Sequence, residues 1–184
     1  MTRRYVVAAL AFAAAACSSG SNVQVRTQSA PAFATTGRST FRILPVPART
    51  DGGTLPSNDP MLANSITNRQ LRQDVRQALE ARGYRPADGE RADFDVAVYA
   101  AANQALDIRS YDYGYTWRGW PREYTTVTPY EKGTVILDLV DPGTRQLLWR
   151  GQGVAQVSDN PNKYANEMGK VVDKIAKKLP EAHS

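Results

Sequence analysis

The side chains that most often act as nucleophiles or bind metals are nearly missing from this sequence. Its 184 residues include one cysteine, Cys17, and one histidine, His183, which stands next to last. Ser-His-Asp and Cys-His catalysis both need a positioned imidazole, and zinc sites are built mainly from histidine and cysteine. There is also no glycine-rich phosphate loop and no calcium-binding EF-hand spacing. The sequence therefore predicts no metal site and no cofactor, and it excludes most hydrolase mechanisms.

Carboxylates are the only remaining side chains that could act as catalytic groups. Asp93 and Asp95 share one face of an alternating segment, and Asp138 stands within an otherwise apolar run. Two carboxyl groups about 5 to 9 Å apart could serve glycoside hydrolysis. In the structural alternative, Asp93 and Asp95 face solvent, and Asp138 pairs with an arginine such as Arg150 across a hairpin. We expect this alternative, and so predict no catalytic residue and no enzyme.

Tyrosine and tryptophan are concentrated in one segment, residues 107–130, together with glycine and arginine. Tyrosine, tryptophan and arginine dominate binding hot spots, and aromatic rings also stack on sugars. The first four aromatic residues alternate, as on one face of a strand. The alternative is an aromatic hairpin packed over a sheet. The candidate binding surface consists of Tyr111, Tyr113, Tyr115, Trp117, Trp120 and Tyr124.

Alternating and apolar runs predict the strands that must position these residues. Strands are expected over 22–28, 40–44, 93–100, 133–140 and 146–157. The strand over 93–100 should have one face buried, whereas the run over 133–140 is apolar on both faces and suits a central strand. Residues 141–144 form a turn, because proline and glycine occupy its central positions. Gly151 and Gly153 indicate a bulge or close packing.

Two segments have the apolar spacing of amphipathic helices. Asp59 and Pro60 should begin the first, as N-cap and first helical residue, and Gly83 should follow its end. Arg69, Arg72 and Arg76 are then exposed to water. The second helix begins at Asn160-Pro161, ends at Pro180, and has its apolar stripe at Tyr164, Met168, Val171, Val172, Ile175 and Leu179. Together these elements predict a single α+β domain, with a mainly antiparallel or mixed sheet and two helices packed on one face.

The N-terminal residues have the organisation of a secretory signal. Two arginines precede an apolar run over 5–16, and the small residues 14–16 lead to Cys17. The run, at about 12 residues, is shorter than the ~20 that span a bilayer. The segment resembles a bacterial lipoprotein signal, in which Cys17 becomes the lipidated first residue. In the alternative, residues 14–16 are an A-x-A cleavage site for ordinary signal peptidase, which releases a soluble protein with a free Cys17.

The signal resemblance divides the chain into a removed signal peptide over 1–16, a lipid-anchored tether over 17–21 and an envelope domain over 22–184. Ser18 stands where an aspartate would favour the inner membrane, so the expected location is the outer membrane, facing the periplasm. The mature chain would have 184 − 16 = 168 residues, and without Arg3 and Arg4 it would have 21 basic and 18 acidic side chains. Its basic residues are mostly scattered, so we expect no nucleic acid partner.

Several motifs in the mature chain resemble the bacterial lipoprotein family catalogued as domain of unknown function 4136. The motifs are VQVRT, TFRILP, ARGY over 81–84, ADFDVAVY over 92–99, GTVILDLVDPGTRQLLWRGQG over 133–153, and the closing amphipathic helix. The resemblance implies a small α+β domain anchored in the cell envelope. It implies no catalytic or binding residues, because the family has no assigned biochemical role.

The expected function is a non-catalytic binding or structural module of the envelope. Its partners would be the membrane, through the lipid anchor, and an envelope protein or peptidoglycan held by the aromatic segment. The alternative is a carrier of a small apolar or lipidic ligand, bound between the sheet and the helices. A carboxylate-based glycan hydrolase is less favoured than either.

Overall fold

The computed structural model describes residues 23–33, 37–87, 91–101, 106–116, 133–158 and 160–182. Trp117, Trp120, Tyr124 and Cys17 lie outside these ranges. The described residues form one six-stranded sheet in the order β1-β6-β5-β4-β2-β3. Its strands are β1 (Gln24–Ser29), β2 (Thr40–Ile43), β3 (Arg85–Pro86), β4 (Phe94–Ala101), β5 (Thr134–Val140) and β6 (Leu147–Val154). The helices are α1 (Ile66–Glu80), α3 (Pro161–Ala176) and two short 3-10 turns, η1 (Pro31–Phe33) and η2 (Ile108–Ser110).

The sheet is mixed, as the sequence predicts. Strands β4, β5, β6 and β1 pair antiparallel, whereas β2 runs parallel to both β4 and β3. The predicted turn joins β5 to β6, and it is stabilised by the Asp141 carboxylate, which accepts the backbone N–H groups of Gly143 and Thr144 at 2.9 Å. Each predicted strand is present, with ends that differ from the expectation by at most three residues.

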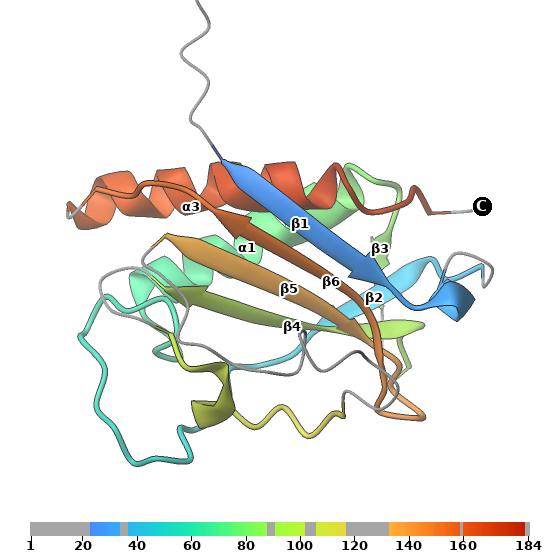
Figure 1. Cartoon of the computed structure of the whole chain (residues 1–184), viewed down its shortest axis with the longest axis horizontal. Helices are drawn as coiled ribbons and strands as arrows, with labels where there is room; N and C mark the ends of the chain where they lie inside the picture. Colours follow the sequence, from blue (N-terminus) through green and yellow to red (C-terminus); the bar gives the residue numbers. More distant parts are fainter. Residues whose placement is uncertain are drawn as a thin grey trace, which may run out of the picture.

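Both helices cover the same face of the sheet (Figure 1). The six residues of the predicted apolar stripe of α3 are at most 1% exposed. The helix lies close to the sheet because β6 has glycines beneath it. A Cβ atom on Gly151 would lie 2.3 Å from Ile175 Cγ2, and one on Gly153 would lie 2.4 Å from Val171 Cγ1. These glycines therefore mark close packing, which confirms one of the two predicted reasons for them.

Helix α1 begins later than predicted, at Ile66 rather than near Asp59 and Pro60. Ser65 is the N-cap, and its side chain accepts a hydrogen bond from the backbone N–H of Asn68 at 3.0 Å. The Asp59 carboxylate instead accepts the backbone N–H of Met61 within a separate turn. The far end is as predicted: Gly83 has φ of 88°, and Tyr84 N–H donates to Leu79 O at 3.2 Å, as in a Schellman motif.

The prediction that β4 has only one buried face is wrong. All eight residues of β4 are buried. One face packs on the helices, and the other is covered by a second hydrophobic cluster, formed with residues from the chain before α1 and from residues 106–115. This cluster includes Met61, Leu106, Ile108, Tyr111 and Tyr113. The domain therefore has two cores, and the tyrosine-rich segment contributes to the second.

Candidate functional site

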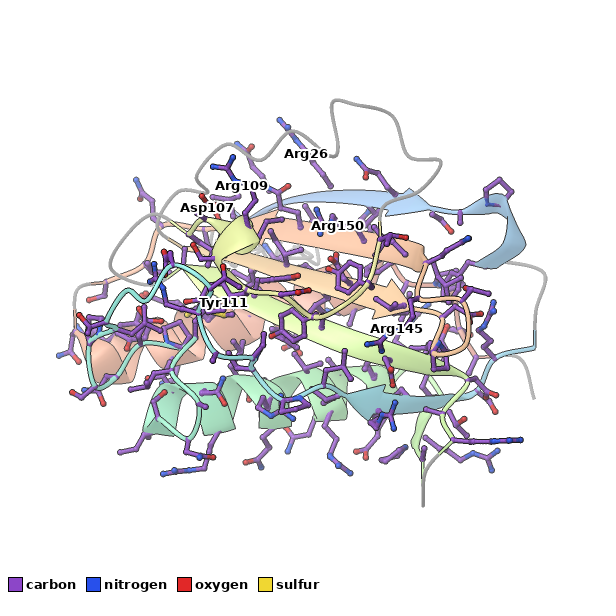
Figure 2. The ribbon with its side chains drawn as sticks, turned by 90° about the horizontal axis from the view of Figure 1, so that it is seen from below. Arg26, Asp107, Arg109, Tyr111, Arg145 and Arg150 are labelled. Carbon is purple, nitrogen blue, oxygen red and sulfur yellow. The ribbon has the colours of Figure 1, made fainter. Side chains whose placement is uncertain are left out.

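The helix-free face of the sheet holds the buried charged residues Asp95, Asp138 and Arg150, and Figure 2 views the molecule from this side. Asp138 on β5 and Arg150 on β6 are cross-strand neighbours, 0% and 4% exposed. Arg150 Nε donates to Asp138 Oδ1 at 2.5 Å, and Arg150 Nη2 donates to Asp138 Oδ2. The Tyr115 hydroxyl also donates to Asp138 Oδ2. The predicted pairing of Asp138 with Arg150 is thus confirmed, and both carboxylate oxygens accept hydrogen bonds.

Tyrosine hydroxyls extend this buried network across the sheet. Tyr99 and Tyr115 have their hydroxyl oxygens 2.9 Å apart. A hydroxyl has a single proton, and Tyr115 donates its own to Asp138, so Tyr99 is the donor to Tyr115. Tyr113 donates to the backbone carbonyl of Val98 at 2.9 Å. Burial raises the pKa of Tyr99, Tyr113 and Tyr115, so all three are neutral hydrogen-bond donors at pH 7.

The structure places three of the six predicted binding residues in packed positions. Tyr111 and Tyr113 are 6% and 8% exposed, and Tyr115 is half-buried, with its hydroxyl against Asp138. The Tyr113 ring lies edge-on to Tyr99, with ring centroids 5.0 Å apart. For Tyr111 and Tyr113 the structure therefore agrees with the packed alternative, because these two residues complete the second core. Trp117, Trp120 and Tyr124 lie outside the described residues.

The segment 111–116 is also not the strand that its alternation suggests. It makes isolated bridges, Tyr111 with Arg49 and Thr116 with Gln146, and Gly114 has φ of 68°. Thr116 N–H donates to Arg145 O at 2.8 Å, and Leu147 N–H donates to Thr116 O at 3.3 Å. These bonds attach the end of the described segment to the beginning of β6.

The other predicted carboxylates differ from each other in their surroundings. Asp95 is 0% exposed, so the expectation that it faces solvent is wrong. Arg42 on the adjacent β2 donates to Asp95 through Nε at 2.8 Å and Nη2 at 3.0 Å. Asp93 is exposed and accepts the backbone N–H groups of Ser39 and Thr40, and the first of these bonds is the main cause of its lowered pKa. A general acid needs a raised pKa, so Asp93 does not suit that role.

A cavity of about 160 Å³ opens beside Tyr111. Arg49 crosses it, with its guanidinium 5.8 Å from the Tyr111 ring centroid, and donates through Nε to Asp51 Oδ1 at 2.8 Å. The Ser110 hydroxyl donates to the other Asp51 oxygen at 3.0 Å. Hydrogen bonding to Arg49 lowers the pKa of Asp51, whereas burial raises the pKa of Tyr111 to about 12. The cavity is small and charged, so its lining suits a compact polar ligand.

Among the described residues, no group of three or more His, Cys, Asp or Glu side chains could hold a metal ion. No helix in the described part of the chain is long and apolar enough to cross a bilayer. Within the part of the chain that the structure describes, the helix-free face offers buried hydrogen-bonded pairs and a small polar cavity. These features can position residues and bind small groups.

The family model of the domain of unknown function DUF4136 matches residues 23–181, which is nearly the whole described domain. The chain belongs to this family. A DUF4136 family protein from Bacteroides thetaiotaomicron VPI-5482 superposes with a TM-score of 0.51 at 18% identity, covering 85% of this chain and 95% of its own. PelC from Paraburkholderia phytofirmans, solved as a dodecamer, gives 0.47 at 14% identity, covering 88% of this chain and 99% of its own. At 18% identity the likeness to the Bacteroides protein shows the fold alone. Comparison with curated proteins finds no match.

Sequence reasoning missed several residues of this DUF4136 domain that contribute to the buried network. Tyr99 stands four positions after Asp95, so strand alternation already places both on one face of β4. Following the residues of this face onto the neighbouring strands of the sheet would predict the tyrosine network. Arg42 and Arg49 carried no such signal, because their carboxylate partners depend on strand pairing and on the path of a loop.

Proposed function

We propose that this DUF4136 protein is a lipoprotein anchored in the outer membrane through Cys17, with its domain facing the periplasm. The observation that carries the proposal is the position of β1. Gln24, its first residue, stands seven positions after Cys17. At 3.3 to 3.6 Å per extended residue, this tether reaches at most about 25 Å. A lipidated Cys17 would therefore hold the edge of the sheet close to the bilayer surface.

We further propose that the domain is a non-catalytic binding or structural module. The carboxylates considered for catalysis support this role, because Asp95 and Asp138 are buried in pairs with arginines and Asp93 accepts backbone N–H groups. Ion-pair networks occur in structural positions as well as in active sites, so these pairs alone do not indicate catalysis. A module of this kind acts by holding a partner near the membrane.

Recognition would depend on the aromatic residues that follow the packed tyrosines, Trp117, Trp120 and Tyr124. The described part of the segment ends at Thr116, which hydrogen bonds join to Arg145 and Leu147. The proposed partner is an envelope protein or a peptidoglycan strand, because aromatic side chains serve both protein hot spots and sugar stacking.

One experiment in living cells tests both parts of the proposal. Cells producing the full chain are labelled with an alkyne fatty acid and fractionated, and a photo-reactive residue replaces Trp120. The control carries it at Lys177, an exposed position directly after the end of α3. We expect lipid label and membrane location that Cys17→Ala abolishes, and a discrete crosslinked product from position 120 alone. An unlabelled wild-type chain refutes the anchor, and equal products from both positions refute the recognition role.

A further inference from the structure

A second cavity of the domain lies at the sheet edge opposite β1, where no residue has been given a role. It is a groove of about 360 Å³ between α1 and the strands β2 and β3. Three arginines line it, Arg42 from β2 and Arg72 and Arg76 from α1, and Phe41, Ile43 and Pro86 contribute apolar surface. The groove exists because β3 pairs only with Thr40 and Phe41. Among the described residues, the rest of β2 has no strand neighbour on that side.

Arg72 carries a half-buried charge with no carboxylate partner in the described part of the chain. Sequence reasoning placed it in water, but it lies partly covered on α1. Its Nη1 donates to Leu44 O at 2.5 Å and its Nη2 to Ile43 O at 3.1 Å. Burial, and to a lesser extent the charge of Arg76, lower the pKa of Arg72. Backbone carbonyls satisfy two of its donors but leave its charge without a counterion.

The other two arginines differ in what they add to the groove. Arg42 alternates with Phe41 and Ile43, which pack on the helix side, and its guanidinium is paired with Asp95 on the other face of the sheet. Arg76 is 54% exposed, and its Nη1 lies 3.9 Å from Glu80 Oε1, beyond hydrogen-bond distance. Arg72 and Arg76 are also i,i+4 neighbours, a spacing at which like charges destabilise a helix. An anion between them would relieve that repulsion.

We propose that this groove binds an oxyanion, a phosphate or carboxylate group on a small ligand. Guanidinium groups present paired N–H donors whose spacing matches the oxygens of both groups. Arg72 and Arg76 neutralise the anion, and the apolar surface contacts the rest of the ligand. The groove and β1 lie at opposite edges of the sheet. This proposal does not depend on lipidation of Cys17.

Isothermal titration calorimetry of the full chain with inorganic phosphate and with succinate, at constant ionic strength, tests the site. We expect saturable binding of at least one anion, and Arg76→Gln should raise its Kd about tenfold. Arg69→Gln is the matched control, because Arg69 is an exposed arginine on α1 outside the groove, and it should change Kd less than twofold. Arg72→Gln should weaken binding as well, but it also removes the bonds to Ile43 and Leu44.

The Arg76→Gln and Arg69→Gln comparison therefore decides the result even if Arg72→Gln unfolds. Binding of phosphate alone supports the site and identifies a phosphoryl ligand, and binding of succinate alone supports it and identifies a carboxylate. Binding of both supports a general oxyanion site. If neither anion binds the wild type, or if the two variants weaken binding equally, the proposal is wrong.

Discussion

The buried pair of Asp138 and Arg150 allows a quantitative test of the second core. In Arg150→Met, the Asp138 carboxylate keeps only the Tyr115 hydroxyl as a donor among its three side-chain bonds. In Asp138→Leu, Arg150, which is 4% exposed in the wild type, loses the carboxylate that accepts its two hydrogen bonds. Removing one member of a buried pair leaves an uncompensated charge, which costs about 3 to 5 kcal/mol. Each single variant should lose this much unfolding free energy.

The double variant Asp138→Leu/Arg150→Met should be much less affected than either single variant. Replacing a buried pair by apolar side chains of similar size is often neutral or stabilising, because neither charge then has to be desolvated. One cost remains, since the Tyr115 hydroxyl loses its acceptor, worth about 1 kcal/mol. The double variant should therefore lie within about 2 kcal/mol of the wild type. This non-additivity distinguishes the pair from two independent core residues.

Urea denaturation followed by circular dichroism at pH 7 measures these differences on the full chain. For a domain of this size, 1 kcal/mol shifts Tm by about 2 to 4 °C, so each single variant should melt roughly 6 to 20 °C below the wild type. A loss under about 1 kcal/mol for Arg150→Met would refute the reasoning, because it would mean that water reaches Asp138. A double variant as unstable as the sum of the singles would refute it as well.

Two further predictions concern the tyrosines and the glycines of the core. Burial raises the pKa of Tyr111 from the usual 10 to about 12, so the unfolded chain loses the hydroxyl proton at a lower pH than the folded chain. The unfolding free energy should therefore fall as the pH rises from about 10 to 12, and it should fall less in Tyr111→Phe. Equal urea midpoints for the wild type at pH 9 and 11.5 would contradict this. Gly151→Ala should cost about 1 to 3 kcal/mol, because its Cβ would lie 2.3 Å from Ile175 Cγ2. Gly37→Ala, with no atom within 4 Å of its Cβ, is the control, and equal melting temperatures would argue against tight packing of α3.

Local patterns were enough to predict the elements whose partners are near in sequence. The β5–turn–β6 hairpin, the apolar stripe of α3 and the pairing of Asp138 with Arg150 all follow from periodicity and a short turn. Helix α1 is the exception: Asp59 and Pro60 are good start signals, yet Asn64 has φ of 67° and Ser65 supplies a nearer cap. When two capping sites compete within six residues, propensity alone does not choose between them.

The buried tyrosines could not be predicted in the same way. Alternating tyrosine, aspartate and glycine is typical of exposed binding loops, and burial of a tyrosine requires a partner for its hydroxyl. Tyr113 finds that partner at Val98 and Tyr115 at Asp138, both on strands distant in sequence. Arg72 likewise lies on the polar side of α1 by its spacing. It becomes half-buried only because β2, from a distant part of the chain, ends beside it.

The pairing of β1 with β6 has a consequence for the order in which the domain folds. Val25 pairs with Gly153, and these residues are more than a hundred positions apart. A chain that emerges from its N-terminus produces β1 first, whereas β6, the one strand that pairs with β1 among the described residues, comes near the end. Until β6 has been made, β1 has no strand to pair with. Bringing β1 and β6 together also closes a loop of more than a hundred residues, which slows folding. The sequence of β1, QVRTQS, is mostly polar, so the unpaired strand can stay exposed to solvent without aggregating.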